Sequence, residues 1–195
     1  MGPAYSTSPI SEGSAIPDMV WKLRKRIDSD DENPFDWSDA STADLFSGKR
    51  IVIFALPGAF TPTCSQEQLP GYKANYDEII ASGVDDVYCI SVNDAFVMRQ
   101  WGLSQGLEED KTVGSLGFKG VKMIPDGAAI FTRGMGMCCT WTSERGFGER
   151  SWRYSAVIND CKIEKMFVEP DRVENSGPDP YVVSDADTML AYLKK

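Results

Sequence analysis

The chain has 195 residues and a formal net charge of −9, with 29 acidic and 20 basic residues, which favours one soluble domain. An acidic surface repels phosphate backbones and anionic lipid, so we expect neither a nucleic acid nor a membrane as a partner. The chain contains no histidine, which excludes Ser-His-Asp and Cys-His catalysis and most zinc sites.

The N-terminal part predicts a flexible arm and then a small strand and helix. Residues 1–15 are polar and rich in Ser, Pro and Gly, without a secretory signal, and the single domain is predicted over residues 16–195. Apolar and basic residues alternate over Met19–Ile27, which indicates a strand, and an acidic turn follows. Ser41, with Asp44 three residues later, predicts the start of a short helix that ends near Gly48.

The next segments alternate between strand and helix patterns. Ile51–Leu56 is a continuous apolar run, typical of a strand buried on both faces, and Pro57-Gly58 ends it. A helix is predicted from Cys64 to Ala81 with a kink at Pro70, then a strand over Asp86–Val92 and a helix capped by Asp94. This β-α-β-α order implies parallel strands with right-handed crossovers.

The second half predicts a hairpin and a closing helix. Residues 106–120 contain four glycines and indicate an irregular loop. Residues 125–127 indicate a turn between two strand-like segments. Trp152–Ile158 and Ile163–Val168 predict an antiparallel hairpin, and Ser184-Asp185 the cap of a final helix. We therefore expect an α/β fold, a central mixed sheet flanked by helices, in the thioredoxin-like element order.

Cys64 is the candidate reactive residue, because it stands at the first turn of a helix directly after a buried strand. Unpaired backbone N–H groups and the helix dipole stabilise a thiolate there, and the thiolate is the nucleophilic form of cysteine. The alternative that these residues leave open is a cysteine that is simply packed in the core.

The pattern Pro57-x-x-x-Thr61-x-x-Cys64 resembles the active-site motif of the peroxiredoxins, and Pro57-Gly-Ala-Phe-Thr-Pro-Thr-Cys-Ser65 is similar to their Prx5 or type II branch, AhpC/TSA-related. The resemblance extends in order over about residues 16–195, through Leu69-Pro-Gly71, residues 89–97, Met123-Ile-Pro-Asp126, residues 134–137, residues 146–155, residues 164–170 and residues 183–190. It implies a thioredoxin-like fold and thiol-dependent reduction of hydrogen peroxide and organic hydroperoxides, in antioxidant defence and redox homeostasis.

The resemblance also implies roles for individual residues. Cys64 would attack the peroxide and become a sulfenic acid, the Thr61 hydroxyl would contact thiolate and peroxide, and Pro57 would shield the site. Arg153 would hold the thiolate ionised and stabilise the leaving oxygen, while Gln68 would donate a hydrogen bond at the pocket rim. Arg150, three residues before Arg153, is expected on the opposite strand face, as the weaker candidate.

The sequence leaves the return to the reduced thiol open. Cys89, 25 residues after Cys64, is the candidate resolving cysteine, with inert packing in a strand as the alternative. Cys138, Cys139 and Cys161 have no predicted role, and Tyr181–Ser184 lacks the resolving cysteine of vertebrate relatives. We therefore expect an external thiol, from glutaredoxin, glutathione or thioredoxin, to complete a one-cysteine cycle.

The remaining expectations concern the setting of the reaction. No metal and no other cofactor is predicted, because the oxidising equivalents come from the substrate. The branch implies a homodimer, and unpaired cysteines favour the cytoplasm, or an organelle if a transit peptide was removed. The alternatives are a redox-sensing relay, a holdase chaperone or a thiol-disulfide oxidoreductase, the last disfavoured because no Cys-x-x-Cys pair exists.

Overall fold

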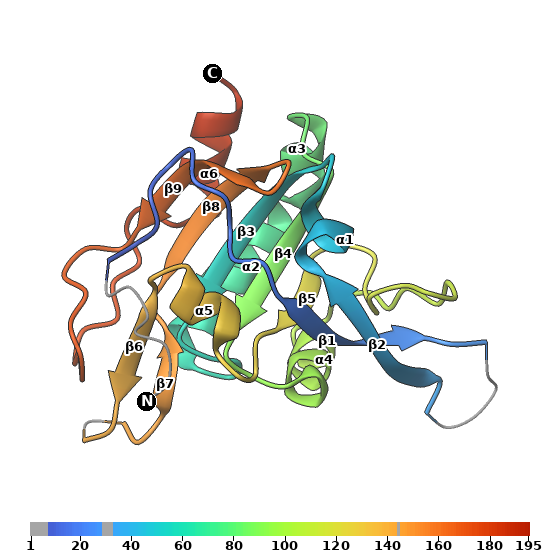
Figure 1. The fold of residues 1–195 in the computed structure, drawn as a ribbon, viewed down its shortest axis with the longest axis horizontal. Coiled ribbons are helices and arrows are strands. Elements are labelled where there is room, and N and C mark those ends of the chain that lie inside the picture. The colour runs from blue at the N-terminus through green and yellow to red at the C-terminus, as the bar shows by residue number, and fades with distance from the viewer. Residues whose placement is uncertain (1–7, 29–32, 144) are drawn as a thin grey trace.

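The computed structural model describes residues 8–28, 33–143 and 145–195. Its centre is a five-stranded mixed sheet in the order β5-β4-β3-β8-β9 (Figure 1). The strands are β3 (Arg50–Leu56), β4 (Asp86–Ser91), β5 (Lys122–Pro125), β8 (Tyr154–Asn159) and β9 (Lys162–Val168). β3 pairs with β4 in parallel and with β8 in antiparallel orientation, so the predicted α/β fold with a mixed sheet is confirmed.

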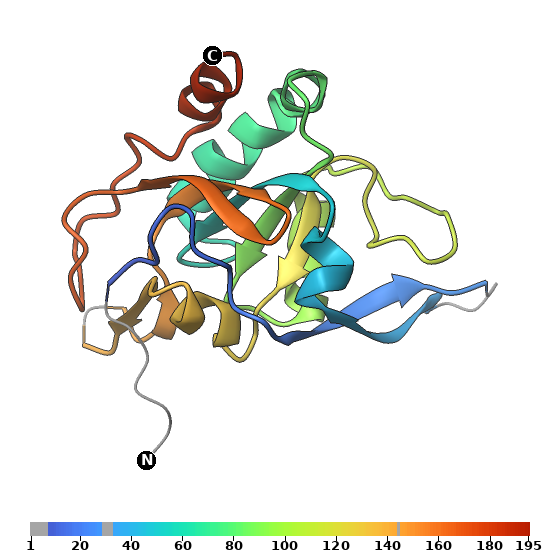
Figure 2. The ribbon, with the colours of Figure 1, turned by 45° about the horizontal axis from the view of Figure 1, so that its top comes forward.

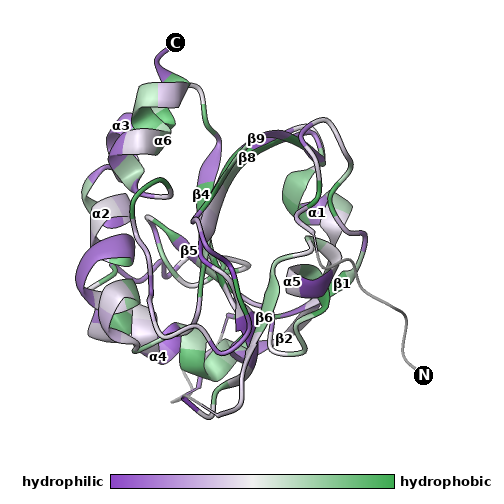
Figure 3. Ribbon diagram, turned by 90° about the vertical axis from the view of Figure 1, so that its left-hand side faces the viewer, coloured by the Kyte–Doolittle hydropathy of each residue, from purple (hydrophilic) through white to green (hydrophobic). Residues whose placement is uncertain are grey.

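Helices cover both faces of this sheet (Figure 3). One face carries α2 (Leu69–Ala74), α3 (Tyr76–Ala81), α4 (Ala95–Ser104) and α6 (Ala186–Leu193). The other carries α1 (Thr42–Phe46), α5 (Ile130–Gly134) and the hairpin of β1 (Val20–Arg26) and β2 (Phe35–Ser41). Because both faces are covered, β3 is buried along its length, which explains its continuous apolar run.

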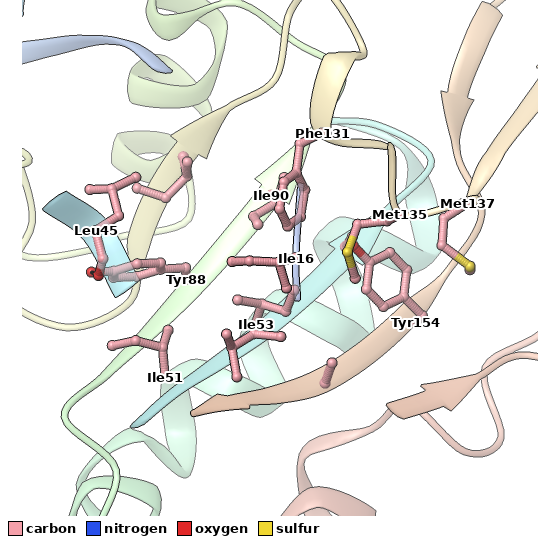
Figure 4. Close-up of a cluster of buried hydrophobic side chains, with 14 of the residues drawn as sticks. Ile16, Leu45, Ile51, Ile53, Tyr88, Ile90, Phe131, Met135, Met137 and Tyr154 are labelled. Atoms are coloured by element: carbon pink, nitrogen blue, oxygen red, sulfur yellow. Dashed lines mark hydrogen bonds between the residues drawn. The ribbon is translucent and has the colours of Figure 1, made fainter. Parts of the chain in front are cut away.

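Alternation along the strands divides the core into two clusters. Ile51 and Ile53 of β3 face α1 and α5 and pack with Tyr88, Ile90 and Phe131 (Figure 4). Val52, Phe54 and Leu56 face the opposite side, in one cluster with Leu69, Tyr72, Met98 and Cys64. The face of the sheet that carries α2 and α4 is therefore the one against which Cys64 packs.

The helix after β3 differs from the one predicted over Cys64–Ala81. It opens with a π-helical turn, η1 (Cys64–Gln68), continues as α2 and is interrupted at Asn75 before α3. Pro70 is the second residue of α2 and follows directly on the π-helical turn. The irregularities of this helix are therefore a π-turn directly before the proline and a break at Asn75.

Several peripheral elements confirm or correct the predictions. The hairpin β8–β9, the strand β1, and the capped helices α1, α4 and α6 are confirmed. β2 was not predicted, and neither was the hairpin of β6 (Cys138–Trp141) and β7 (Gly148–Ser151). The turn at residues 125–127 leads into α5 rather than a second strand, because Asp126 accepts hydrogen bonds from the N–H groups of Phe131 and Thr132.

The N-terminal segment runs along the body (Figure 2). Residues 1–7 of the arm that we predicted lie outside the described residues. In the remaining part, the N–H of Ile10 donates to Met135 and that of Gly13 to Ile163. Residues 106–120 form the irregular loop that was predicted, with one bridge between Glu109 and Phe118. Among the described residues, no helix has the length and apolarity needed to cross a bilayer.

We predict that Ser41→Ala destabilises the fold by about 1 kcal/mol in urea unfolding, the usual effect of removing a helix N-cap. The Ser41 hydroxyl accepts from the N–H of Asp44, and the Asp44 carboxylate accepts from the N–H of Ser41. The exposed Ser143→Ala is the control and should unfold like the parent chain. Equal stability of both variants would show that the capping box contributes nothing.

Candidate active site

Cys64 lies where the chain leaves the central strand β3 and begins the helix. Pro57 and Gly58 are buried at the bend after β3, and the N–H of Ser65 donates to the carbonyl of Thr61 as the helix starts. The Cys64 side chain is fully buried. Its sulfur is therefore packed among the neighbouring side chains of the site.

Arg153 is the polar group in contact with that sulfur. It stands just before β8, on the same face as Val157, and is only 1% exposed. Its Nη1 donates to Cys64 Sγ at 3.4 Å and also to Gln68 Oε1. Nη2 donates to Asp179 Oδ1 at 2.5 Å and Nε to the carbonyl of Pro180 at 3.1 Å. The structure thus brings together residues 64 and 153, a contact that the family resemblance implied.

The electrostatics of Arg153 reflect this burial. Desolvation acts to lower the pKa of the guanidinium, but the charges of Cys64 and Asp179 more than offset it and raise the pKa above its usual value. A permanently charged guanidinium in a water-poor site attracts an anion strongly. The positive charge of Arg153 therefore lies directly against the Cys64 sulfur.

Gln68 lies one helical turn after Cys64 and is fully buried, not at the pocket rim as we expected. Its Oε1 accepts from Arg153, while its Nε2 has no hydrogen-bond partner among the described residues. The amide therefore fixes one arm of the guanidinium and leaves a buried donor unpaired.

Thr61 and Pro57 occupy the bend that precedes Cys64. The Thr61 hydroxyl donates to the carbonyl of Gly58 at 2.8 Å, so its oxygen is left as an acceptor. Phe60, the loop residue directly before Thr61, has a positive φ of 65° and is exposed. Asn93 Oδ1 accepts from the N–H of Ala59 at 3.0 Å and fixes this bend to the end of β4.

Arg150 approaches the bend in a way that the sequence did not predict. It lies on β7, which ends before Arg153, so the two residues are not on opposite faces of one strand. Its Nη1 donates to the carbonyl of Val92 at 3.1 Å and stands 3.1 Å from the point where a Cβ on Gly58 would lie. Glycine at position 58 thus allows the guanidinium to pack on the backbone, a reason visible only in three dimensions.

Cys89 lies in the middle of the sheet. It sits on β4 between Phe54 of β3 and Met123 of β5, and is fully buried in the same apolar cluster as Cys64. Burial, together with the nearby charge of Cys64, raises the pKa of the Cys89 thiol well above its usual value. A central strand leaves this thiol little freedom to move or ionise.

The other three cysteines are free thiols on β6 and in the β8–β9 turn. Burial raises the pKa of both Cys138 and Cys139 to about 11, and Cys139 Sγ donates to the carbonyl of Val173 at 3.1 Å. Cys161, in the β8–β9 turn, is half-buried and its pKa is raised by burial and by Asp160. Within the described part of the chain, no three His, Cys, Asp or Glu side chains gather as a metal site.

Comparison with known proteins places these features in one family. The Redoxin family model matches residues 11–190. Peroxiredoxin sll1621 of Synechocystis is 52% identical over 92% of this chain and 89% of its own. The hybrid peroxiredoxin hyPrx5 of Haemophilus influenzae is 43% identical over 93% of this chain and 66% of its own.

Solved structures agree with these relatives. The antioxidant protein of Plasmodium falciparum, described as a 1-Cys peroxiredoxin, superimposes with a TM-score of 0.82 at 34% identity, covering 94% of this chain and 99% of its own. Reduced Prx3 of Vibrio vulnificus in complex with H₂O₂ superimposes with a TM-score of 0.73 at 33% identity, with the same coverage.

We predict that iodoacetamide at pH 7 labels Cys64 before the other four cysteines, as measured by peptide mapping in a labelling time course. A pKa of about 11 leaves roughly one Cys138 or Cys139 thiol in ten thousand ionised at that pH. Cys64 has an arginine in contact with its sulfur, and a neighbouring positive charge is the setting in which cysteines are reactive. Earlier labelling of Cys138 or Cys161 would contradict this reading of the site.

Proposed function

This chain belongs to the peroxiredoxins, within the Redoxin family, and from that premise we propose that Cys64 is its peroxidatic residue, supported by Arg153, Thr61, Pro57 and Gln68. As a peroxiredoxin it is a peroxidase oxidoreductase with an antioxidant function. The observation that carries the proposal is the 3.4 Å contact between Arg153 Nη1 and a fully buried Cys64 Sγ at a helix start.

The reaction balances as a two-electron transfer from sulfur to oxygen. The Cys64 thiolate, formed by loss of its proton to solvent, attacks one peroxide oxygen, and the Sγ–O bond forms as the O–O bond breaks. The sulfur becomes a sulfenic acid, and the leaving oxygen takes up a proton as water or an alcohol. Hydrogen peroxide and organic hydroperoxides both fit this step, because only the O–O group reacts.

The surrounding side chains act on the charge that moves during this step. Negative charge leaves the sulfur and appears on the departing oxygen, and Arg153 donates toward both positions. Thr61, whose hydroxyl donates to Gly58, offers its oxygen as an acceptor for the peroxide O–H. Gln68 Nε2 offers a donor to the oxygen bound to sulfur. Pro57, buried at the bend, keeps water away from the thiolate.

We propose that an external thiol regenerates Cys64. A first thiol, from glutaredoxin, glutathione or thioredoxin, attacks the sulfenic acid and releases water. A second thiol then reduces the mixed disulfide and frees Cys64. The burial of Cys89 in a central strand and its raised pKa favour this one-cysteine cycle over resolution by Cys89.

The proposal extends to the setting of the enzyme. A homodimer formed through loops around the site would cover Phe60 and Phe96, which are 57% and 51% exposed. Five free cysteines are consistent with a reducing compartment such as the cytoplasm. A redox-sensing relay or a holdase remains the alternative function, and peroxide turnover without a bound client protein separates the enzyme from both.

We predict that Cys64→Ser abolishes peroxide consumption with dithiothreitol as reductant, while Cys89→Ser keeps at least about half of the parent activity. Cys161→Ser is the control, since that thiol lies in the β8–β9 turn. Consumption at the parent rate by Cys64→Ser would refute the proposed function. Loss of activity in a folded Cys89→Ser variant would instead identify a two-cysteine cycle.

We predict that Arg153→Met lowers kcat/KM for hydrogen peroxide by about 10²- to 10³-fold, the usual cost of removing one donor to a developing oxyanion. Arg145→Met is the charge-matched control, since Arg145 is exposed and, among the described residues, donates to the carbonyl of Gly177. Stopped-flow fluorescence measures both. A loss of less than about threefold would leave the proposed role of Arg153 without support.

A further inference from the structure

We call the segment between β9 and α6, residues 169–185, the C-terminal strap. It contacts Arg153, the residue whose Nη1 donates to Cys64. It has no regular secondary structure and follows the rim of the molecule before α6 (Figure 1). Two of its residues, Asp179 and Pro180, accept hydrogen bonds from Arg153. The strap therefore contacts the guanidinium that acts on Cys64.

The hydrogen bonds of the Arg153 guanidinium go to two parts of the chain, the helix that begins at Cys64 and the strap. Nη1 is directed to Cys64 and Gln68, while Nη2 and Nε are directed to Asp179 and Pro180 of the strap. A planar guanidinium held at two of its nitrogens has its third direction fixed by geometry. The strap thus determines where Nη1 points.

Charge adds a second reason for the pairing. The Arg153 side chain is 1% exposed and that of Asp179 is 22% exposed, so their ion pair at 2.5 Å lies largely out of water. A buried guanidinium without a fixed counter-charge would be drawn toward solvent. Asp179 supplies a negative charge to Arg153 that does not depend on the oxidation state of Cys64.

The strap is itself anchored next to the site. The carboxylate of Glu169, 1% exposed, accepts from the N–H groups of Val182, Val183 and Ser184 and from the Ser184 hydroxyl at 2.7–3.0 Å. The Tyr72 hydroxyl, on the helix below Cys64, donates to the carbonyl of Ser184 at 2.9 Å. The Glu169 bonds join the two ends of the strap to each other, and the N–H of Glu169 donates to the carbonyl of Arg153 at 3.1 Å. The Tyr72 bond connects the strap to the helix that carries Cys64.

We propose that Asp179 is a positioning residue that orients Arg153 toward Cys64, with Glu169 as the anchor that holds the strap. Asp179 does not touch the reacting atoms and acts through the guanidinium. The inference rests on the proposed function, because it requires Arg153 to act on the Cys64 reaction.

The test is a double-mutant cycle on kcat/KM for hydrogen peroxide, with the full chain and dithiothreitol. In the parent background, Asp179→Ala should lower kcat/KM by about 30- to 100-fold, since small misplacements of a catalytic group cost that much. In the Arg153→Met background, the same substitution should change it by less than about threefold. Asp179→Glu should recover most of the activity, because it restores the carboxylate.

Controls separate positioning from a general loss of structure. The exposed Asp187→Ala on α6 removes the same charge and should keep parent activity. Asp179→Asn, which retains shape and one acceptor, replaces the alanine variant if that one unfolds before the parent in a thermal melt. With Asn, a smaller loss that again disappears in the Arg153→Met background would support the proposal.

Two results would overturn the inference. The first is parent activity in Asp179→Ala while Arg153→Met is impaired. The second is an equal loss from Asp179→Ala in both backgrounds, which would show a structural effect that does not pass through Arg153. Parent activity in Arg153→Met itself would instead refute the proposed function, and with it the premise of this inference.

Discussion

The pairing of a buried arginine with a buried cysteine is the constraint on which the rest of this structure depends. A guanidinium taken out of water is costly unless each of its donors finds an acceptor. Arg153 has four acceptors, namely one sulfur, one amide, one carboxylate and one carbonyl. The helix of Cys64, the strand start at Arg153 and the segment of Asp179 must therefore all reach their places before the site exists.

The sheet supplies most of this convergence. Cys64 and Arg153 are 89 residues apart in sequence, yet each stands at the same end of one of two neighbouring strands. Antiparallel pairing of β3 with β8 places the end of one strand beside the beginning of the other. Strand alternation then sets Arg153 on the face that Cys64 occupies.

The helix that begins at Cys64 contributes further polar side chains, which extend from the site into the core. Cys64, Gln68 and Tyr72 recur every four residues and form one stripe of the helix, directed at the sheet. Tyr72 stacks on Phe54 with ring centroids 4.1 Å apart, while its hydroxyl reaches the strap. The same residues that pack the core thus also hold the elements around Arg153.

Local patterns were sufficient for the regular part of the fold. The buried run Ile51–Leu56, the caps at Ser41, Asp94 and Asp185, and the β8–β9 hairpin each follow from short-range signals, and the structure confirms them. The β6–β7 hairpin and the β2 strand lack such a signal, because their strands are short or rich in Asp, Ser, Gly and Glu, which do not favour strands. The π-turn at Cys64–Gln68 likewise has no simple signature in the sequence.

By itself, the sequence determined the candidate site at Cys64 and the helix that carries it, since a cysteine after a buried strand and a Pro57-Gly58 bend is a local feature. Its resemblance to a family named Thr61, Pro57 and Arg153. Only the tertiary structure decided that Gln68 is buried, that Arg150 packs on Gly58 and that the strap binds Arg153. Those facts depend on which side chains meet across the sheet and through an irregular segment, and neither periodicity nor spacing encodes such meetings.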